Sequence, residues 1–104
     1  MGKAVAFALA QQGATIAVND LNLETAEATV HELKNKGVDT LAVPGDVTDK
    51  NAVQNMVQQT LDHFGALHIL INNAGILYPT KVIDIPEDEW DRVIEVNLKG
   101  TFLC

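Results

Sequence analysis

The sequence is poor in cysteine, in cationic side chains and in long apolar runs, and each shortage excludes something. Its single cysteine, Cys104, cannot form an internal disulfide, which fits the reducing cytoplasm. The apolar runs Ala4–Ala10 and Leu67–Ile71 are far shorter than the roughly 20 residues that span a bilayer. Seven Lys and Arg against 14 Asp and Glu leave a formal charge of −7, which argues against nucleic acid or an anionic membrane as the main partner. We therefore expect a cytoplasmic protein that binds neither.

The N-terminal stretch imitates a secretory signal only weakly. Lys3 precedes the apolar run AVAFALA, which contains an A-x-A pattern. One lysine is a thin cationic region, and the run is at the lower limit of the usual length. Cleavage there would also remove a helix that leads directly into the first predicted strand, so we expect no signal peptide.

Short β-branched runs alternate with amphipathic stretches over the 104 residues, a length that suits one small domain. Strands are predicted at Thr15–Asn19, Thr40–Val43 and Leu67–Ile71. Their nearly continuous apolar character is typical of parallel strands covered on both faces. Alternation of this kind indicates parallel strands joined by crossover helices, so the predicted fold class is α/β.

Four helices are predicted around these strands: residues 3–12, Leu23–Lys36, Asp49–Phe64, and a last helix that begins near Pro86. Asn22 and Thr48 are the expected N-caps of the second and third helices, and Gly37 and Gly65 their ends. The stripes expected to face the core are Leu23, Ala26, Val30 and Leu33 in the second helix, and Val53, Met56, Val57, Leu61 and Phe64 in the third.

The last predicted helix has an acidic first turn, Glu87–Glu89, and an asparagine on its expected inner face. That face consists of Trp90, Val93, Ile94, Asn97 and Thr101. A buried Asn97 needs hydrogen-bond partners. Two interpretations stay open: a satisfied structural amide in the core, or a side chain that bonds a backbone carbonyl, distorts the helix and exposes the residue's own carbonyl to a water.

Gly2 and Asp20 have the types and spacing of a dinucleotide site. A glycine at a helix start lets the helix pack closely on a sheet while its amides point at a pyrophosphate. Asp20 closes a predicted strand 18 residues after Gly2, and the dinucleotide fingerprint places a ribose-binding acid about 20 residues on. A carboxylate there would repel a 2′-phosphate, and no cationic residue follows until Lys34, which favours NAD over NADP. Alternatively, Gly2 is a small residue after the start methionine and Asp20 only shapes a turn.

Two further groups follow predicted strands, where ligands bind in open parallel sheets. Asp46 could accept a hydrogen bond from an adenine amino group, with Val47 against the ring, or it could be a turn aspartate. Asn72 and the triplet Asn73-Ala74-Gly75 combine two amides with small residues that allow a cofactor to approach the backbone. A plain turn is the alternative for this segment.

Together these segments resemble the short-chain dehydrogenase/reductase family. The residues concerned are GKAVA-x-x-LAQQGA, VND, GDVTD, LHILINNAG and WDRVIEVNLKGTF, which cover essentially the whole chain in order. The resemblance implies a Rossmann-type doubly wound parallel sheet and hydride transfer between NAD(P) and an alcohol or carbonyl substrate. By the same resemblance, Asn97 is the catalytic asparagine, and the cofactor-binding residues are Gly2, Asp20, Leu21, Asp46, Val47, Asn73, Ala74 and Gly75.

The resemblance also implies that residues 1–104 form a partial NAD(P)-binding Rossmann domain. Residues 1–104 contain no counterpart of the family's first strand, of the first glycines of its TGxxxGxG pattern or of its catalytic Ser. They also lack its Tyr-x-x-x-Lys pair, because the only tyrosine, Tyr78, has Val82 at the lysine position. We therefore expect an incomplete sheet that lacks the strand between its second and fourth strands. We also expect these 104 residues alone to be inactive.

The functional alternatives are a non-catalytic nucleotide-binding module, a partner of a complete subunit, and a flavodoxin-like phosphate-signal domain. The last is disfavoured because NNAG and VNLKG have no role in it. No metal site is expected, whereas the resemblance implies homo-oligomers that use the helix ending at Cys104. The residues of the loop Ile76–Ile85, which follows NNAG, do not identify a substrate.

Overall fold

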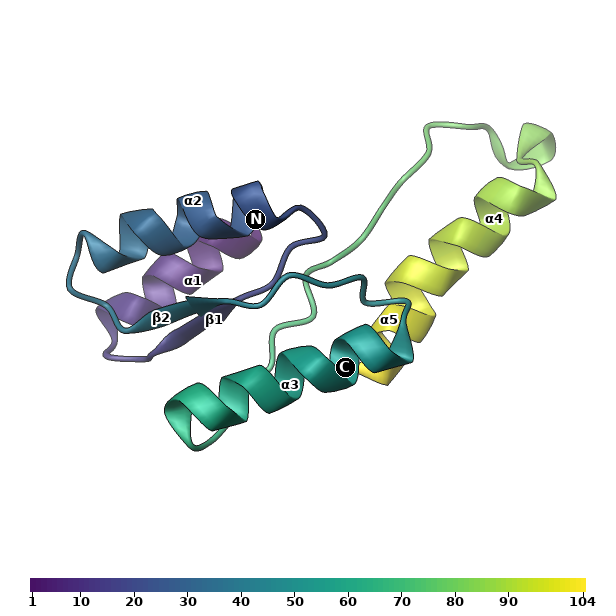
Figure 1. Ribbon diagram of the computed structural model, residues 1–104. Coiled ribbons are helices and arrows are strands. Elements are labelled where there is room, and N and C mark those ends of the chain that lie inside the picture. The colour runs from purple at the N-terminus through teal and green to yellow at the C-terminus, as the bar shows by residue number, and fades with distance from the viewer.

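Two parallel strands lie between helices (Figure 1). The computed structural model describes all residues, 1–104. Strand β1 (Ile16–Val18) pairs in parallel with β2 (Thr40–Ala42), and Ile16 lies opposite Thr40. Helix α2 packs on both strands and α1 on β1, while Figure 1 shows α3 on the other side of the strand pair from α2. The predicted α/β class with parallel strands is confirmed.

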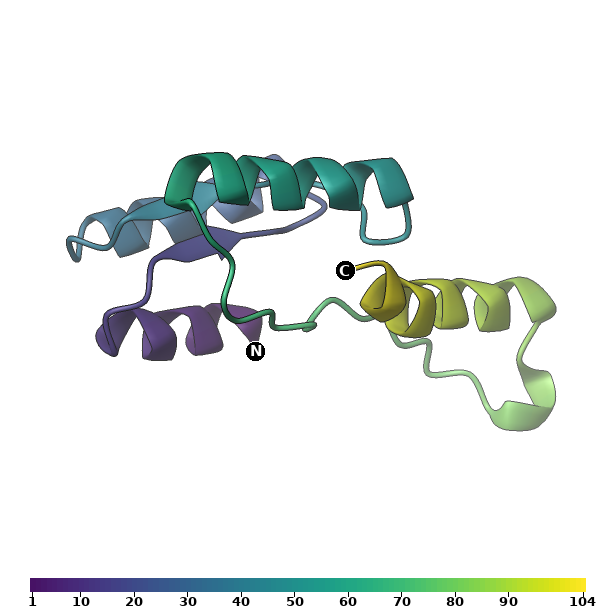
Figure 2. The ribbon, with the colours of Figure 1, turned by 90° about the horizontal axis from the view of Figure 1, so that it is seen from below.

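The helices follow the predicted order. Their bounds are α1 Gly2–Gln11, α2 Leu23–Lys34, α3 Lys50–Phe64, a 3₁₀ turn η1 at Val82–Asp84, α4 Glu87–Ile94, a π-helical turn η2 at Glu95–Lys99, and α5 Gly100–Leu103. The elements α4, η2 and α5 follow one another without a break and are called the last helical segment, Glu87–Leu103. Figure 2 shows the long extended link that joins α3 to this segment. None of these helices combines the length and the hydrophobicity needed to cross a membrane.

The helix ends confirm most of the predicted caps. The Asn22 side chain accepts hydrogen bonds from the amides of Glu24 and Thr25, at 2.8 and 3.3 Å. Gly65 ends α3 in the left-handed region with φ of 79°, which a glycine adopts without strain. Helix α2 ends at Lys34, two residues earlier than predicted, and Gly37 closes the following turn at φ of 78°.

The predicted N-cap Thr48 is wrong, because Asp49 fills that position. The Asp49 carboxylate accepts from the amides of Asn51 and Ala52 at 2.7 and 3.3 Å. The amide and hydroxyl of Thr48 instead donate to the Asp46 carboxylate. An aspartate two residues upstream therefore competes for Thr48 and shifts the cap by one position.

The core contains the predicted inner residues of α2 and part of those of α3. Buried side chains of α2 include Ala26, Val30 and Leu33, whereas Leu23, in the first turn, is 47% exposed. In α3, Val53 and Met56 form a cluster with Val43, against which Ala17, Leu41, Leu103 and Cys104 pack. Leu61 is 37% exposed, so the α3 stripe is only partly covered.

The predicted third strand does not form. Residues 67–71 are outside any helix or strand, and the sheet has two strands only. Their apolar side chains stay exposed, with Ile69 at 57% and Leu70 at 50%. A strand needs a hydrogen-bonded neighbour, and no strand of residues 1–104 pairs with this segment. The apolar run is therefore left uncovered.

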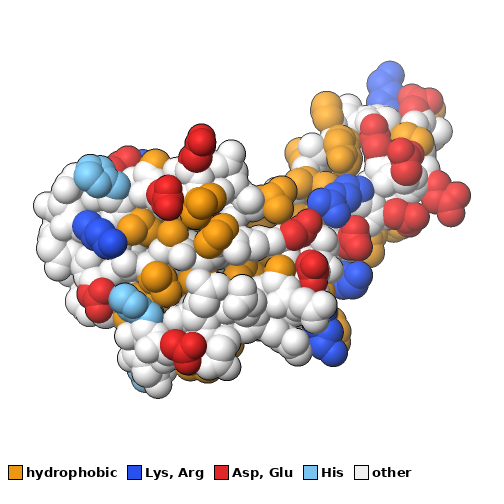
Figure 3. Space-filling model, in the orientation of Figure 1, with side chains coloured by type: hydrophobic (Ala, Val, Ile, Leu, Met, Phe, Trp, Pro, Cys, Tyr) orange, Lys and Arg blue, Asp and Glu red, His pale blue; other side chains and the backbone are white.

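The predicted inner face of the last helix is wrong in the same way. Trp90 is 57% exposed and Ile94 38%, whereas the buried residues of this segment are Val96 and Gly100. Residues 1–104 supply no surface that covers the Trp90 side. The acidic first turn of α4, Glu87–Glu89, is confirmed. Acidic side chains gather at the upper right of Figure 3, over the region of α4.

The uncovered segment generates a stability prediction for residues 1–104 in isolation. Burial of a Leu or Ile side chain stabilises a fold by about 1.5–3 kcal/mol, and total stabilities are only about 5–15 kcal/mol. With Leu67–Ile71 exposed and one edge of β1 unpaired, we expect a broad thermal transition, aggregation or association with another chain. Circular dichroism melts with sedimentation analysis measure this, and a sharp two-state melt of a monomer would contradict it.

Candidate functional site

The loops that follow β1 and β2 are joined at the carboxyl edge of the sheet. The Asn19 amide donates to the carbonyls of Val43 and Gly45, both at 3.0 Å. The Gly45 amide in turn donates to the Asp20 carbonyl at 3.2 Å. Parallel strands end at the same edge, so the two predicted acids, Asp20 and Asp46, lie in adjoining loops. The sequence analysis missed the role of Asn19, whose only signal is a polar residue at the end of an apolar strand.

Gly2 lies against Asn73 at the start of α1. A Cβ at Gly2 would be 2.7 Å from Nδ2 of Asn73 and 3.0 Å from its Cγ. Such a contact is shorter than real Cβ atoms show, so a larger residue would push the Asn73 side chain away. Helix α1 has no acidic side chain in its first turn, which leaves its positive end uncompensated by a carboxylate. Two residues of the predicted cofactor site, 71 positions apart, are thus in direct contact.

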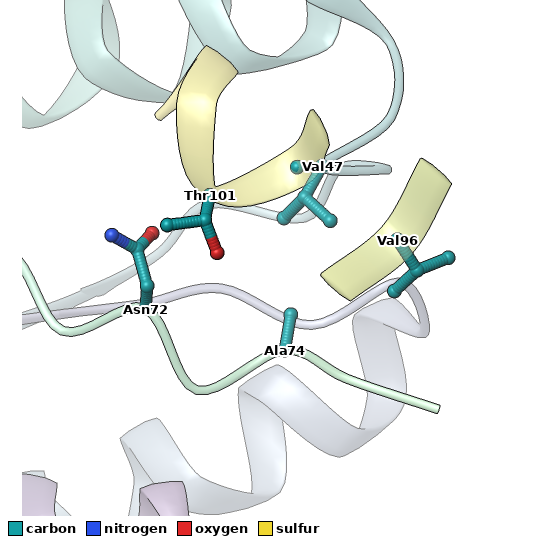
Figure 4. Close-up of a pocket in the computed structure, with 6 residues that line it drawn as sticks. Val47, Asn72, Ala74, Val96 and Thr101 are labelled. Atoms are coloured by element: carbon teal, nitrogen blue, oxygen red, sulfur yellow. The ribbon is translucent and has the colours of Figure 1, made fainter. Parts of the chain in front are cut away.

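A small cavity brings the Asn72–Gly75 segment to the loop after β2. Its volume is about 10 Å³, enough for about one water. The lining residues are Val47, Asn72, Ala74, Val96, Gly100 and Thr101. Figure 4 shows them coming from three sources: the extended segment, the loop before α3 and the last helical segment. The cavity therefore marks the place where the predicted adenine-binding loop at Val47 meets the predicted cofactor-binding segment Asn72–Gly75.

Asn97 anchors the end of this segment. Its Oδ1 accepts from the Ile76 amide at 2.8 Å, and its Nδ2 donates to the Ile76 carbonyl at 3.0 Å. A Cβ at Gly75 would lie 3.4 Å from Asn97 Oδ1, which is a tight contact. The side chain thus bonds both the N–H and the C=O of Ile76, which belong to successive peptide groups, and fixes the chain just after NNAG.

The expectation that Asn97 is buried is wrong, because the residue is exposed. The expectation of a carbonyl-bonded, helix-distorting asparagine is confirmed, since Asn97 is the middle residue of the π-helical turn Glu95–Lys99. Such turns are rare and occur often at functional sites. The Asn97 carbonyl accepts from the Thr101 hydroxyl at 2.9 Å.

Asp46 is the most strongly held acid of the site. Its Oδ1 accepts from the Thr48 amide at 2.9 Å and from the Thr48 hydroxyl at 2.8 Å. Its Oδ2 lies 3.8 Å from Nη2 of Arg92. The hydrogen bonds from Thr48, aided by the Arg92 charge, hold the pKa of the Asp46 carboxyl below its usual value of 3.8. Asp46 is therefore an anion at neutral pH.

Asp20 and Leu21 occupy a turn before α2. Oδ1 of Asp20 accepts from the Asn22 amide at 2.9 Å, so the side chain does shape the turn, as one interpretation holds. This turn uses one carboxyl oxygen, and Asp20 stays partly exposed. Leu21 is 70% exposed. No hydrogen bond or ion pair joins this turn to Gly2 or Asn73.

The last helical segment touches the loop after β2 through residues that the sequence analysis did not select. A Cβ at Gly100 would lie 2.8 Å from Cγ2 of Val47, so a glycine is required for the two elements to approach this closely. Arg92 reaches the same loop at Asp46. Glycine and arginine in a helix are too common to reveal these roles by pattern.

A scan against family models matches the whole chain, residues 1–104, to the model described as short chain dehydrogenase. Among curated relatives, BbsD of Thauera aromatica, a (2S)-[(R)-hydroxy(phenyl)methyl]succinyl-CoA dehydrogenase subunit, is 45% identical over 104 residues. The 3-oxoacyl-[acyl-carrier-protein] reductase FabG of Staphylococcus aureus is 43% identical over 105 residues. Each match takes in 100% of this chain but only 42% and 43% of those proteins. The chain thus spans less than half the length of these relatives.

Solved structures agree with the fold. A 3-ketoacyl-ACP reductase from Sinorhizobium meliloti superposes with a TM-score of 0.90 at 36% identity, covering 98% of this chain and 40% of that structure. A mutant short-chain dehydrogenase/reductase from Serratia marcescens also gives a TM-score of 0.90, at 35% identity, covering 98% of this chain and 42% of that structure. These similarities confirm the incomplete Rossmann-type α/β fold.

The paired bonds between Asn97 and Ile76 generate a prediction about local order. In Asn97→Ala, the Ile76 amide loses its acceptor, and its hydrogen exchange is expected to accelerate about two- to tenfold. Exchange is read by mass spectrometry or NMR in the full gene product that contains residues 1–104. The matched control is Asn55→Ala on α3, and the Val43 amide, which donates to Val18 in the strand pair, reports on the fold. Unchanged exchange at Ile76 would remove the anchoring role from Asn97.

Proposed function

The chain belongs to the short-chain dehydrogenase family, and from this premise we propose that its protein is an NAD(P)-dependent oxidoreductase acting on an alcohol or carbonyl substrate. The main support is the junction at the carboxyl edge of the sheet, where Gly2 touches Asn73 and where Val47, Asn72 and Ala74 line one cavity. Open parallel sheets bind dinucleotides at this edge. The names of the relatives include a dehydrogenase and reductases, which fits hydride transfer in either direction.

The residues at this edge fit a dinucleotide in their chemistry. The start of α1 offers amide donors and a positive dipole end for a pyrophosphate, and the absence of a Cβ at Gly2 lets Asn73 approach this helix end. Asp46 and Val47 offer an anionic acceptor and an apolar contact for adenine. The Asn73–Gly75 backbone, held by Asn97 at Ile76, would line the nicotinamide end. When bound, the nicotinamide accepts or donates the hydride.

Within residues 1–104, Asn97 is the proposed member of the catalytic group. Its amide holds the backbone N–H and C=O of Ile76 in place, and the π-helical turn around it fixes the direction of the side chain. No Tyr-x-x-x-Lys pair stands in these residues, because Val82 occupies the fourth position after Tyr78. Such a pair would supply the proton to or from the substrate oxygen. We propose that residues 1–104 form the cofactor-binding part and do not catalyse the reaction alone.

The second candidate is a nucleotide-binding module without catalysis, or a partner of a complete subunit. The observations behind the proposed function, the approach of Gly2 to Asn73 and the cavity at Val47, bear on cofactor binding, which this candidate shares. The two candidates separate in one experiment on the full gene product: both bind dinucleotide, but only the oxidoreductase changes the nicotinamide absorbance when alcohols or ketones are added.

A preference for NAD over NADP is proposed from Asp20. The carboxylate stands in the turn after β1, and like charges placed together cost several kcal/mol, so a 2′-phosphate would be repelled there. The first cations that follow in the sequence are Lys34, in the last turn of α2, and Lys36, just after its end. Nothing in this turn offers to neutralise the phosphate.

Removal of the Asp20 charge is expected to weaken this discrimination. For Asp20→Ser, the ratio of NADP affinity to NAD affinity should rise by about tenfold or more. Calorimetric titration of the full gene product with both cofactors measures it, with Asp62→Ser on α3 as the matched loss of a carboxylate. Tighter binding of NADP than of NAD by the unaltered protein would refute the assignment of Asp20, and failure to bind either would refute the proposed function.

Homo-oligomerisation through the last helical segment is also proposed. Apolar residues four positions apart share one helix face. Here they are Trp90, Ile94, Leu98 and Phe102, with exposures of 57%, 38%, 64% and 83%. A row of this kind marks an interaction surface. We also propose a cytoplasmic location, because the single cysteine of residues 1–104, Cys104, forms no internal disulfide.

A charge on this face is expected to break the assembly. Phe102→Glu should shift the full gene product to a smaller species in sedimentation velocity, because a carboxylate cannot be buried between apolar helices without a partner. Val82→Glu, equally exposed at 85% but outside the face, serves as the control. An unaltered protein that is already monomeric would end the proposal.

A further inference from the structure

A chain of charges links the loop after β2 to the last helical segment. Arg92 lies between two carboxylates: its Nη2 is 3.8 Å from Oδ2 of Asp46, and its Nη1 donates to Oε2 of Glu95 at 3.0 Å. Lys99 donates to the other oxygen of Glu95 at 3.4 Å. Arg92 and Asp46 are partly exposed, with side chains at 40% and 35%. A bound molecule could therefore reach the Asp46 carboxylate.

The geometry leaves Asp46 with room for one more donor. A carboxylate has about four acceptor positions. The two donors of Thr48 occupy Oδ1, and Arg92 stands beside Oδ2 at a distance longer than a hydrogen bond. Oδ2 is therefore the oxygen that an incoming amino group would meet, and Arg92 is the side chain beside that oxygen.

Desolvation gives Arg92 a role that Thr48 cannot fill. A ligand that covers Asp46 removes water from an anion, which is costly unless a counter-charge stays beside it. Thr48 supplies neutral donors, whereas the Arg92 guanidinium supplies a fixed positive charge. Glu95 accepts a hydrogen bond from that guanidinium on the helix side. Val47 packs on Gly100 one turn further along, so the loop is held close to the helix.

We infer that Arg92 is a positioning residue for the adenine end of the dinucleotide site: it holds and neutralises Asp46 so that the carboxylate can accept the adenine amino group. This inference rests on the proposed function. Arg92 acts through Asp46 and makes no contact of its own with the cofactor. The last helical segment thereby supports both ends of the site, through Asn97 at Ile76 and through Arg92 at Asp46.

The test compares ligands that share only one end of the dinucleotide. In the full gene product, Arg92→Gln is expected to weaken binding of AMP and NAD about three- to tenfold and to leave nicotinamide mononucleotide unchanged. Arg92→Lys should recover part of the loss, since a lysine keeps the charge but not the two-pronged geometry. Lys34→Gln removes an exposed cation of α2 that forms no ion pair with Asp46 or Glu95, and it should behave like the unaltered protein.

A double-mutant cycle separates positioning from general support of the fold. If Arg92 acts through Asp46, then Arg92→Gln causes no further loss of AMP affinity in the Asp46→Asn background. A full additional loss there, an Arg92→Gln that binds AMP as tightly as Lys34→Gln does, or an equal loss for nicotinamide mononucleotide overturns the inference. An unaltered protein that binds neither NAD nor AMP overturns the proposed function instead, so the two failures are distinguishable.

Discussion

Parallel pairing of β1 with β2 is the constraint on which the rest of this structure depends. Because the strands run in the same direction, Asp20 and Asp46 both leave the sheet at one edge. Asn19 then ties the two loops together, with its amide on Val43 and Gly45. An antiparallel pairing would send the two acids to opposite ends of the strands. One local pairing of three residues on each strand therefore brings the two candidate site residues to the same edge.

The other half of the site is assembled from segments far apart in sequence. Gly2 touches Asn73, Val47 touches Gly100, and Asn97 holds Ile76. None of these contacts lies within the sheet, which consists of β1 and β2 only. Residues 67–71, which precede Asn73, form no strand. Hydrogen bonds of side-chain amides and close contacts at glycines hold these segments together, in place of backbone hydrogen bonds between strands. This explains why so many of the site's asparagines and glycines have a defined partner.

Local patterns predicted most features that a few adjacent residues decide, but not the N-cap of α3, where Asp49 takes the place of the predicted Thr48. The Asn22 cap, the left-handed Gly65 and the acidic start of α4 at Glu87 each depend on neighbours within one helical turn. Predictions of burial failed at Leu67–Ile71 and at Trp90, because burial depends on a surface that covers the side chain. The hydrophobic pattern marks which residues ought to be covered, but it does not show that the covering element is present among residues 1–104.

The sequence by itself determined the α/β alternation, most of the helix caps and the chemical types of the candidate site residues, since these follow from short-range periodicity and from motifs. Only the tertiary structure decided which of those residues meet, and it added Asn19, Arg92 and Gly100 to the site. The reason is physical: a side chain's partner across a loop is set by the path of the backbone, which no run of neighbouring residues specifies.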